Sequence, residues 1–147
     1  MKAQGNKRLR ILLFDDNSLV RSVLSSLLAK RGWEVLGFSA PSACPLYHSA
    51  SCACQVAEVC ADAIVTDLDM PDIDGFCFVK GLLEKGCRIK NLAILSGSQD
   101  TVAWARARAF GLSVFSKAEG IPDLLEWLQH VEALIQTDRR LIRWAEA

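Results

Sequence analysis

The chain of 147 residues is 51% hydrophobic and carries 17 basic and 17 acidic residues. Its length suits one domain with a substantial core and leaves no room for a second globular domain, while the balanced charge gives no overall attraction to nucleic acid or to an anionic membrane. The polar start and the break at Asp15 lead us to expect no secretion signal and no membrane span, which needs about 18 apolar residues. A cytoplasmic location is therefore expected, in which the six cysteines are thiols or ligands rather than disulfides.

The first elements are a strand, a helix and a second strand. The short β-prone run Ile11–Phe14 predicts the first strand. A helix capped by Asn17 or Ser18 and ending at Gly32 follows, because apolar residues recur there at helical spacing. Residues 33–38 are predicted to form the second strand. The apolar stripe of the helix, which is expected to pack on the sheet, consists of Leu19, Val20, Val23, Leu24, Leu27 and Leu28.

The middle of the chain begins irregularly and then returns to the same alternation. Residues 39–61, rich in Ala, Ser and Cys, are expected to form a loop and a weakly patterned helix. The run Ala63–Thr66 predicts a strand, and a Pro and a Gly set a turn over residues 70–75. A helix follows that ends at Gly86. Its inward side chains are expected to be Phe76, Val79, Leu82 and Leu83.

The last third of the chain contains two further strands and two further helices. Leu92–Leu95 and Leu112–Phe115 are the predicted strands, separated by a helix over Ser98–Phe110 that the following glycine stops. Residues 137–147 either extend the fifth helix or form a short tail. That fifth helix has Pro122 near its first turn and carries the apolar residues Leu124, Leu125, Leu128, Val131 and Ile135.

Strands that alternate with helices pair in parallel, so the predicted fold class is α/β, a doubly wound five-stranded parallel sheet with helices on both faces. In such a three-layer sandwich, ligands bind where the carboxyl ends of the strands gather. Polar residues follow four of the strands. These residues, expected to meet at one edge, are Asp15 and Asp16, Asp67, Ser96 and Lys117.

The expected cluster has a chemical use. Converging carboxylates repel one another, and a hard divalent cation with oxygen ligands relieves that repulsion, which makes Mg²⁺ the candidate ion. A carboxylate beside the cation can then attack a phosphoryl group and form an acyl phosphate. The ammonium of Lys117 and the hydroxyl of Ser96 would hold the phosphoryl oxygens that the metal does not reach.

On these motifs the chain resembles the response regulator receiver domain of two-component signalling. The resemblance covers roughly residues 9–136 and implies a single receiver domain over residues 1–147 with a flavodoxin-like (βα)5 fold. Four motifs in the right order carry it, namely Phe14-Asp-Asp16, Asp67-Leu-Asp-Met-Pro-Asp-Ile-Asp-Gly75, Leu95-Ser-Gly97 and Ser116-Lys117.

The resemblance implies that Asp67 accepts a phosphoryl group from the phosphohistidine of a histidine kinase or phosphotransfer protein. It further implies that Asp16, Asp67 and the backbone carbonyl of Asp69 bind Mg²⁺, that Asp15 acts through a metal-bound water, and that Ser96 and Lys117 bind the phosphoryl group. The chain would then be a phosphoacceptor rather than an enzyme. It would signal by phosphorylation-dependent binding of a protein partner or by homodimerisation.

Two departures from the family pattern lie near Lys117. Ala118 follows the lysine where the family has Pro, so we expect a trans peptide there, since a cis bond without proline costs about 2.5–4 kcal/mol. Val114 stands where receivers commonly place an aromatic residue that rotates on phosphorylation, and Phe115 is its neighbour. Our hypothesis is that Phe115 belongs to the core and that switching runs through Ser96 and the helix over Ser98–Phe110.

The cysteine-rich segment has two interpretations. Thiols and an imidazole could bind zinc or an iron–sulfur cluster or sense oxidation, or the cysteines could serve as small apolar residues. The absence of a Cys-x-x-Cys pair favours the second interpretation, and Cys77 and Cys87 are expected to pack within helices. The residues of the segment are Cys44, His48, Cys52, Cys54 and Cys60.

Trp104 lies beside Arg106 and Arg108 on the side where receivers commonly meet partners, a combination typical of interface hot spots, although Trp104 could equally belong to the core. The basic residues of the tail are expected to form a solvated helix face rather than a nucleic-acid site; they are Arg139, Arg140 and Arg143.

Two other functions remain open at this point. A haloacid-dehalogenase-like phosphatase would use Asp67 and Asp69 as nucleophile and acid/base, but the acidic pair expected after the lysine is missing and Asp15-Asp16 would have no role. A pseudo-receiver would use the cysteine-rich segment as its input and never be phosphorylated. The sequence does not distinguish a stand-alone receiver from a fragment of a longer protein.

Overall fold

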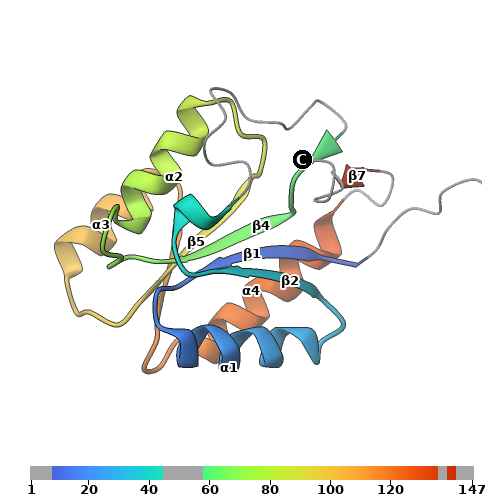
Figure 1. The fold of residues 1–147 in the computed structure, drawn as a ribbon, viewed down its shortest axis with the longest axis horizontal. Helices are drawn as coiled ribbons and strands as arrows, with labels where there is room; N and C mark the ends of the chain where they lie inside the picture. The colour runs from blue at the N-terminus through green and yellow to red at the C-terminus, as the bar shows by residue number, and fades with distance from the viewer. Residues whose placement is uncertain (1–7, 45–57, 136–138, 142–147) are drawn as a thin grey trace, which may run out of the picture.

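The computed structural model describes residues 8–44, 58–135 and 139–141. Its centre is a five-stranded parallel sheet with the strand order β2-β1-β4-β5-β6 (Figure 1). This order is that of a doubly wound sheet, since the chain runs outward from β1 to β2, crosses back to β4 and then continues to the other edge. The strands are β1 (Arg10–Phe14), β2 (Glu34–Phe38), β4 (Ala63–Asp67), β5 (Asn91–Ser96) and β6 (Ser113–Ser116).

Four α-helices cover the two faces of the sheet. In Figure 1, α1 and α4 lie on one face, and α2 and α3 lie on the other. The predicted doubly wound α/β sandwich is thereby confirmed. The additional helix predicted within residues 39–61 falls mostly on positions 45–57, outside the described residues, and the described part holds only the 3₁₀ turn η1 (Pro41–Ala43) and β3 (Glu58–Val59). The helices are α1 (Ser18–Ala29), α2 (Gly75–Glu84), α3 (Thr101–Ala109) and α4 (Ile121–Leu134).

The three inner strands are buried on both faces, which explains why their sequences are almost continuously apolar. One layer joins Leu12, Ile64 and Ile94 to α2 and α3, and the opposite layer joins Val65 and Leu95 to α1 and α4. Burying each such side chain contributes about 1.5–3 kcal/mol relative to leaving it in water. These two layers fix the sheet whose edge carries the site.

The helices α1, α2 and α3 begin at polar caps and end near glycines, whereas α4 begins after Gly120 without a side-chain cap. The carboxylate of Asp74 accepts the N–H of Cys77 at 2.7 Å, and that of Asp100 accepts the N–H of Ala103 at 3.0 Å. The cap at Asp100 makes α3 begin at Thr101, so the prediction that this helix starts at Ser98 is wrong. The predicted stops are confirmed, because a positive φ occurs at Gly32, Gly86 and Gly111.

The predicted apolar stripe of α1 is only partly buried. Leu24 and Leu28 pack against the sheet, whereas Leu19 is 72% exposed and Val23 is 57% exposed. Successive helical residues are rotated by about 100°, so Leu19 and Val23 lie well away from the line that runs through Val20, Leu24 and Leu28. The expectation that all six apolar residues pack on the sheet is therefore wrong.

The described part of the tail is a strand and does not extend the last helix. β7 (Arg140–Leu141) pairs in parallel with β3 (Figure 1). The Arg139 guanidinium forms a bidentate ion pair with Asp62, at 2.6 Å from Nη2 to Oδ2 and 2.7 Å from Nε to Oδ1. Asp62 also accepts the backbone N–H of Arg10 at 2.9 Å. Arg139 therefore pairs with Asp62 and is not part of a solvated helix face. Arg140 is exposed on the strand β7, and Arg143 lies outside the described residues.

Of the described helices, none combines the length and the apolar character that crossing a membrane requires.

We expect Arg139→Ala to lower the free energy of unfolding by about 3–5 kcal/mol, because it leaves the buried Asp62 carboxylate without its cationic partner. The side chains of this pair are only 9% and 4% exposed. Urea denaturation would measure the change. The neighbouring Arg140→Ala is the matched control, and its exposed side chain should matter by no more than about 0.5 kcal/mol. Equal stabilities of the two variants would contradict a structural role for the ion pair.

Candidate functional site

Three carboxylates meet at the carboxyl edge of the sheet. Asp15 and Asp16 follow β1, Asp67 ends β4, and these two strands are paired neighbours. Each residue offers one oxygen, and the three oxygens lie within 4.8 Å of one another. Asp15 and Asp67 are buried, at 1% and 6% exposure, whereas Asp16 is exposed. The cluster therefore consists of two buried carboxylates and one carboxylate that is exposed to solvent.

Lys117 links the two buried carboxylates. Its Nζ lies 2.8 Å from Oδ2 of Asp15 and 3.3 Å from Oδ2 of Asp67. The Lys117 backbone N–H donates to the carbonyl of Ser96 at 2.8 Å, which ties the end of β6 to the end of β5. The structure thus brings the predicted carboxylates and the predicted ammonium together at one edge.

Burial and charge act against each other at this site. Burial raises the pKa of Asp67, the charge of Lys117 lowers it, and the charge of Asp15 raises it again, so that the net pKa is above the ordinary value. Burial lowers the pKa of Lys117, but its hydrogen bond to Asp15 and the charges of Asp67 and Asp15 raise it more, and the net pKa is raised. Lys117 therefore stays charged at neutral pH, and its charge favours the ionised form of Asp67.

Ser96 borders the cluster without joining its ion pairs. The side chain is fully buried. Its hydroxyl lies 3.1 Å from the hydroxyl of Ser98 and accepts the Ser98 backbone N–H at 3.1 Å. Within the described part of the chain, no hydrogen bond joins Ser96 to Asp67.

The loop after Asp67 depends on a close backbone approach. The N–H of Gly75 donates to the carbonyl of Leu68 at 2.8 Å. A Cβ at position 75 would stand 2.3 Å from the carbonyl oxygen of Asp67, so only glycine fits there. Asp69 is exposed, and its backbone N–H donates to the Asp67 carboxylate at 3.3 Å.

The Lys117 loop is held without the proline of the family pattern. The Ser116 hydroxyl accepts the N–H of Ala118 at 3.1 Å and that of Glu119 at 3.4 Å. Gly120 closes the loop, since a Cβ there would stand 2.6 Å from the backbone nitrogen of Ser116. All peptide bonds of the described residues are trans, as expected at Lys117–Ala118.

Sequence reasoning missed two supporting contacts of the Asp15 loop. The Arg21 guanidinium donates to the Asp15 carbonyl at 2.7 Å, and the Asn17 N–H donates to the Asp15 carboxylate at 2.9 Å. The helical spacing between positions 17 and 21 was the available signal for the first contact, because it places Arg21 one turn above the helix cap. These contacts orient Asp15 toward Lys117.

The cluster fits a hard cation. Mg²⁺ prefers carboxylate and carbonyl oxygens and keeps several waters, so it binds well to a few carboxylates at a surface that is open on one side. Asp15, Asp16 and Asp67 offer such a set, with Asp16 at the open side. No second group of three potential ligands of this kind occurs in the described ranges.

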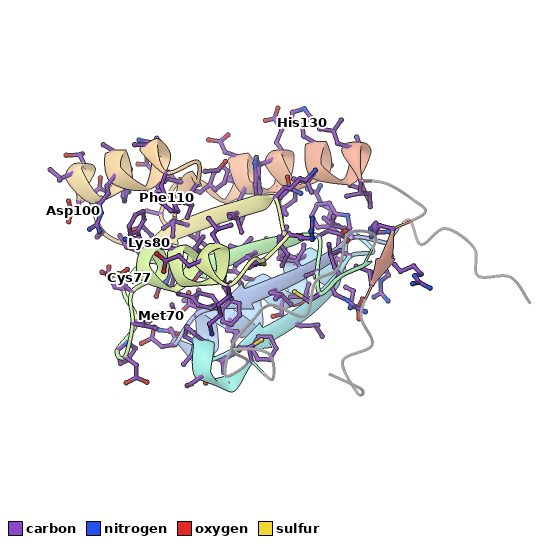
Figure 2. All side chains as sticks on the ribbon, turned by 90° about the horizontal axis from the view of Figure 1, so that it is seen from above. Met70, Cys77, Lys80, Asp100, Phe110 and His130 are labelled. Carbon is purple, nitrogen blue, oxygen red and sulfur yellow. The ribbon has the colours of Figure 1, made fainter. Side chains whose placement is uncertain are left out.

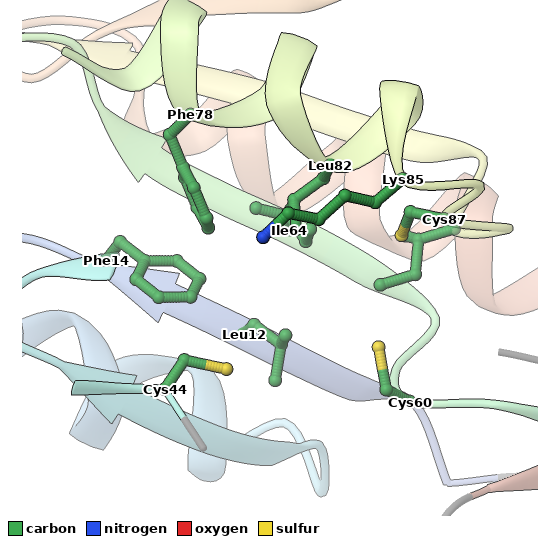
Figure 3. A pocket seen from close by; sticks show the side chains of 10 residues that line it. Leu12, Phe14, Cys44, Cys60, Ile64, Phe78, Leu82, Lys85 and Cys87 are labelled. Atoms are coloured by element: carbon green, nitrogen blue, oxygen red, sulfur yellow. The ribbon is translucent and has the colours of Figure 1, made fainter. Parts of the chain in front are cut away.

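The described cysteines do not form a comparable site. Cys44 and Cys60 belong to the apolar core, and together with Cys87 they line an apolar pocket beside Leu12 and Phe14 (Figure 3). Cys52, Cys54 and His48 lie outside the described residues.

Cys77 is exposed on the first turn of α2, so the prediction that it packs within the helix is wrong (Figure 2). The carboxylate of Asp74 that caps the helix also lies 3.6 Å from the Cys77 thiol, which holds the side chain at the helix start.

The side chain of Trp104 is half-buried, so its exposure lies between that of a surface interface residue and that of a core residue, the two predicted alternatives. The Arg108 guanidinium stands 5.8 Å from its ring centroid. Arg106 instead lies over Phe76, at 4.3 Å from that ring centroid, and therefore faces α2. The indole N–H of Trp104 is buried and finds no acceptor among the residues that the structure describes.

Comparison with known proteins adds a family match and one curated relative. The family model described as the response regulator receiver domain matches residues 11–129. A protein-glutamate methylesterase/protein-glutamine glutaminase 2 of Hahella chejuensis is 28% identical over 124 residues, which cover 82% of this chain and 32% of that protein. The chain therefore spans about a third of the length of this relative.

Solved receiver structures share the fold. The non-phosphorylated HemR receiver domain of Leptospira biflexa matches with a TM-score of 0.70 at 20% identity, over 88% of this chain and 98% of that chain. Chemotaxis protein CheY4 of Vibrio cholerae matches with a TM-score of 0.66 at 22% identity, over 84% of this chain and 98% of that chain. At these identities the likeness establishes the fold.

Lys117→Met is expected to raise the pKa of Asp67 further, because burial and the charge of Asp15 then act without the opposing ammonium. A carboxyl group with a raised pKa binds its proton more tightly in the folded state, so its contribution to stability is lost as the pH rises through that pKa. Carbon-13 NMR titration of the Asp67 carboxyl group would measure the shift. Lys30→Met, at the far end of α1, is the control, and an Asp67 pKa that Lys117→Met leaves unchanged would contradict the expectation.

Proposed function

Because the chain belongs to the response regulator receiver family, we propose that it accepts a phosphoryl group on Asp67 and signals by phosphorylation-dependent binding of a protein partner. The observation that carries this proposal is the position of the Lys117 ammonium between the buried carboxylates of Asp15 and Asp67. A buried carboxylate that faces an ammonium and two further carboxylates suits attack on a phosphoryl group.

The proposed reaction moves the phosphoryl group from nitrogen to oxygen. An Asp67 carboxylate oxygen attacks the phosphorus of a phosphohistidine, and the new P–O bond forms as the P–N bond breaks. The electron pair of that P–N bond returns to the imidazole of the donor. Lys117 favours the ionised, nucleophilic form of Asp67 and faces the charge of the incoming phosphoryl group.

Further residues would hold the metal and the phosphoryl group. Asp16, Asp67 and the backbone carbonyl of Asp69 would hold Mg²⁺, with Asp15 acting through a water. Bound Mg²⁺ would supply positive charge to the phosphoryl oxygens. Ser96 and Lys117 would bind the oxygens on the other side. In this role the chain is a phosphoacceptor in the cytoplasm and turns over no separate substrate.

The proposed partners follow from the family. The phosphoryl donor is a histidine kinase or a phosphotransfer protein, and the output is a protein partner or a second copy that meets the face formed by α3, β6 and α4. The chain covers 32% of the Hahella methylesterase, so the activities in that protein's name are not carried over. The proximity of Asp15 and Asp16 to Asp67 favours the receiver over the phosphatase, which gives that pair no role.

Incubation with acetyl phosphate and Mg²⁺ is expected to add one phosphoryl group to the native chain, as measured by intact mass. Asp67→Asn should abolish the gain, because the amide is not a nucleophile. Asp72→Asn, at an exposed position of the same loop, is the matched control and should keep it. Chelation of Mg²⁺ should suppress the gain as well.

If the native chain gains no mass from acetyl phosphate or from a panel of phosphorylated histidine kinases, with sampling fast enough to catch rapid hydrolysis, the phosphoacceptor proposal fails and the pseudo-receiver becomes the better account.

Switching is proposed to run through Ser96 and α3 rather than through a rotating aromatic residue. Phe115 packs against Trp127, with 5.8 Å between the ring centroids, and belongs to the apolar layer under α4. Val114 packs on the opposite layer. Rotation of Phe115 would therefore disrupt the core.

Addition of beryllofluoride and Mg²⁺ should shift the amide NMR signals of α3 while the ring signals of Phe115 stay in place. The helix α1 beyond its first turn serves as the internal reference. Unchanged signals throughout α3, with beryllofluoride shown to be bound at Asp67, would contradict this route.

A further inference from the structure

The hydroxyl of Ser96 is engaged by a residue that the family match does not single out. Ser96 ends β5 and is fully buried. Its oxygen accepts the Ser98 backbone N–H and lies 3.1 Å from the Ser98 hydroxyl. Two contacts from one residue therefore define where this hydroxyl points.

Ser98 is in turn connected to the start of α3. Its hydroxyl accepts the backbone N–H of Asp100 at 3.4 Å. Asp100 then caps α3 through the N–H of Ala103, and it lies at the same end of the molecule as Met70, which belongs to the loop after Asp67 (Figure 2). A continuous series of hydrogen bonds thus runs from Ser96 to the first turn of α3.

Gly97, between the two serines, lies against the aliphatic part of Lys117. A Cβ at this position would stand 3.6 Å from Cδ of Lys117. The turn that carries the Ser96–Ser98 contact is therefore packed directly on the lysine that bridges Asp15 and Asp67. A conformational change in this turn would therefore alter the position of Lys117 beside Asp67.

We propose that Ser98 is a positioning residue that holds the Ser96 hydroxyl in hydrogen bonds to the turn before α3. The proposal rests on the proposed function, in which Ser96 binds a phosphoryl oxygen on Asp67. To donate its single proton to that oxygen, the Ser96 hydroxyl must give up any hydrogen bond that it donates to the Ser98 hydroxyl. Breaking the Ser96–Ser98 contact removes one hydrogen bond between the end of β5 and the turn that leads to the cap of α3. A phosphoryl group on Asp67 therefore changes the start of that helix.

A merely structural Ser98 makes a different prediction. If its hydroxyl only stabilised the turn, its removal would lower the stability of the chain and leave binding of a phosphoryl analogue unchanged. If the Ser98 hydroxyl instead keeps the Ser96 hydroxyl away from Asp67, removing it strengthens the binding of the phosphoryl analogue, because the competing contact no longer has to be broken. The direction of the change in affinity distinguishes the two roles.

The first experiment compares beryllofluoride affinity in the presence of Mg²⁺. Ser98→Ala is expected to bind about threefold to tenfold more tightly than the native chain, the range that one lost hydrogen bond allows. Ser98→Thr, which keeps the hydroxyl, should bind like the native chain. Ser26→Ala, at an exposed position of α1, is the matched control. Unchanged or weaker binding by Ser98→Ala would overturn the proposal.

A second measurement needs neither metal nor phosphoryl analogue. Three-bond NMR couplings report the χ1 rotamer of Ser96, which should be single in the native chain and partly averaged in Ser98→Ala, because the variant keeps the contact from the backbone N–H but loses the contact with the hydroxyl. A single, unchanged rotamer in the variant would overturn the positioning role. If the native chain fails to bind beryllofluoride, the phosphoacceptor function fails, and the coupling measurement still decides whether Ser98 fixes Ser96.

Discussion

The ion pairs of Lys117 with Asp15 and Asp67 are the contacts on which the rest of the site depends. Burial raises the pKa of Asp67, and the adjacent ammonium opposes that rise and favours the ionised carboxylate in a shielded position. The backbone is shaped to permit this approach: Gly75 fits under the Asp67 carbonyl, and Gly120 fits against Ser116. The site is therefore a balance of desolvation against charge, set by loops that tolerate only glycine at two positions.

The sheet fixes the relative positions of the residues that form this site. β1, β4, β5 and β6 all run in the same direction, so the residues after them meet at one edge. The inner strands are fixed by two apolar layers, which leaves the loops and helix starts as the parts able to respond. The turn from Ser96 to Asp100 is one such part, since hydrogen bonds hold it and it packs on the aliphatic part of Lys117 rather than within the two apolar layers. Rigid strands and an adjustable turn are what a two-state signalling element needs.

Much of the fold and of the candidate site could be predicted from the sequence because both depend on local patterns. Strand ends, helix caps and glycine stops are encoded within a few residues, and the polar residues at four strand ends indicate the site. The partial burial of the apolar residues of α1 was harder to predict, since Leu19 and Leu24 are the same residue type in one apolar pattern although only Leu24 is buried. The Arg139–Asp62 pair was not predictable, because it joins residues 77 positions apart and no local signal marks it. Ser98 was overlooked for a similar reason, as its role depends on where the neighbouring hydroxyl points.

The buried pair of Asp62 and Arg139 bears on what counts as the domain. The family match ends at residue 129, so it excludes the guanidinium that neutralises Asp62. Asp62 immediately precedes β4, and Asp67 ends the same strand, so one five-residue strand has a buried charge at each end. A fragment trimmed to the family boundaries would keep both carboxylates but lose one of the two cations that balance them. We therefore expect the part of the chain that folds when it is expressed alone to extend beyond the part that resembles other receivers, and to include the segment that returns to pair with β3.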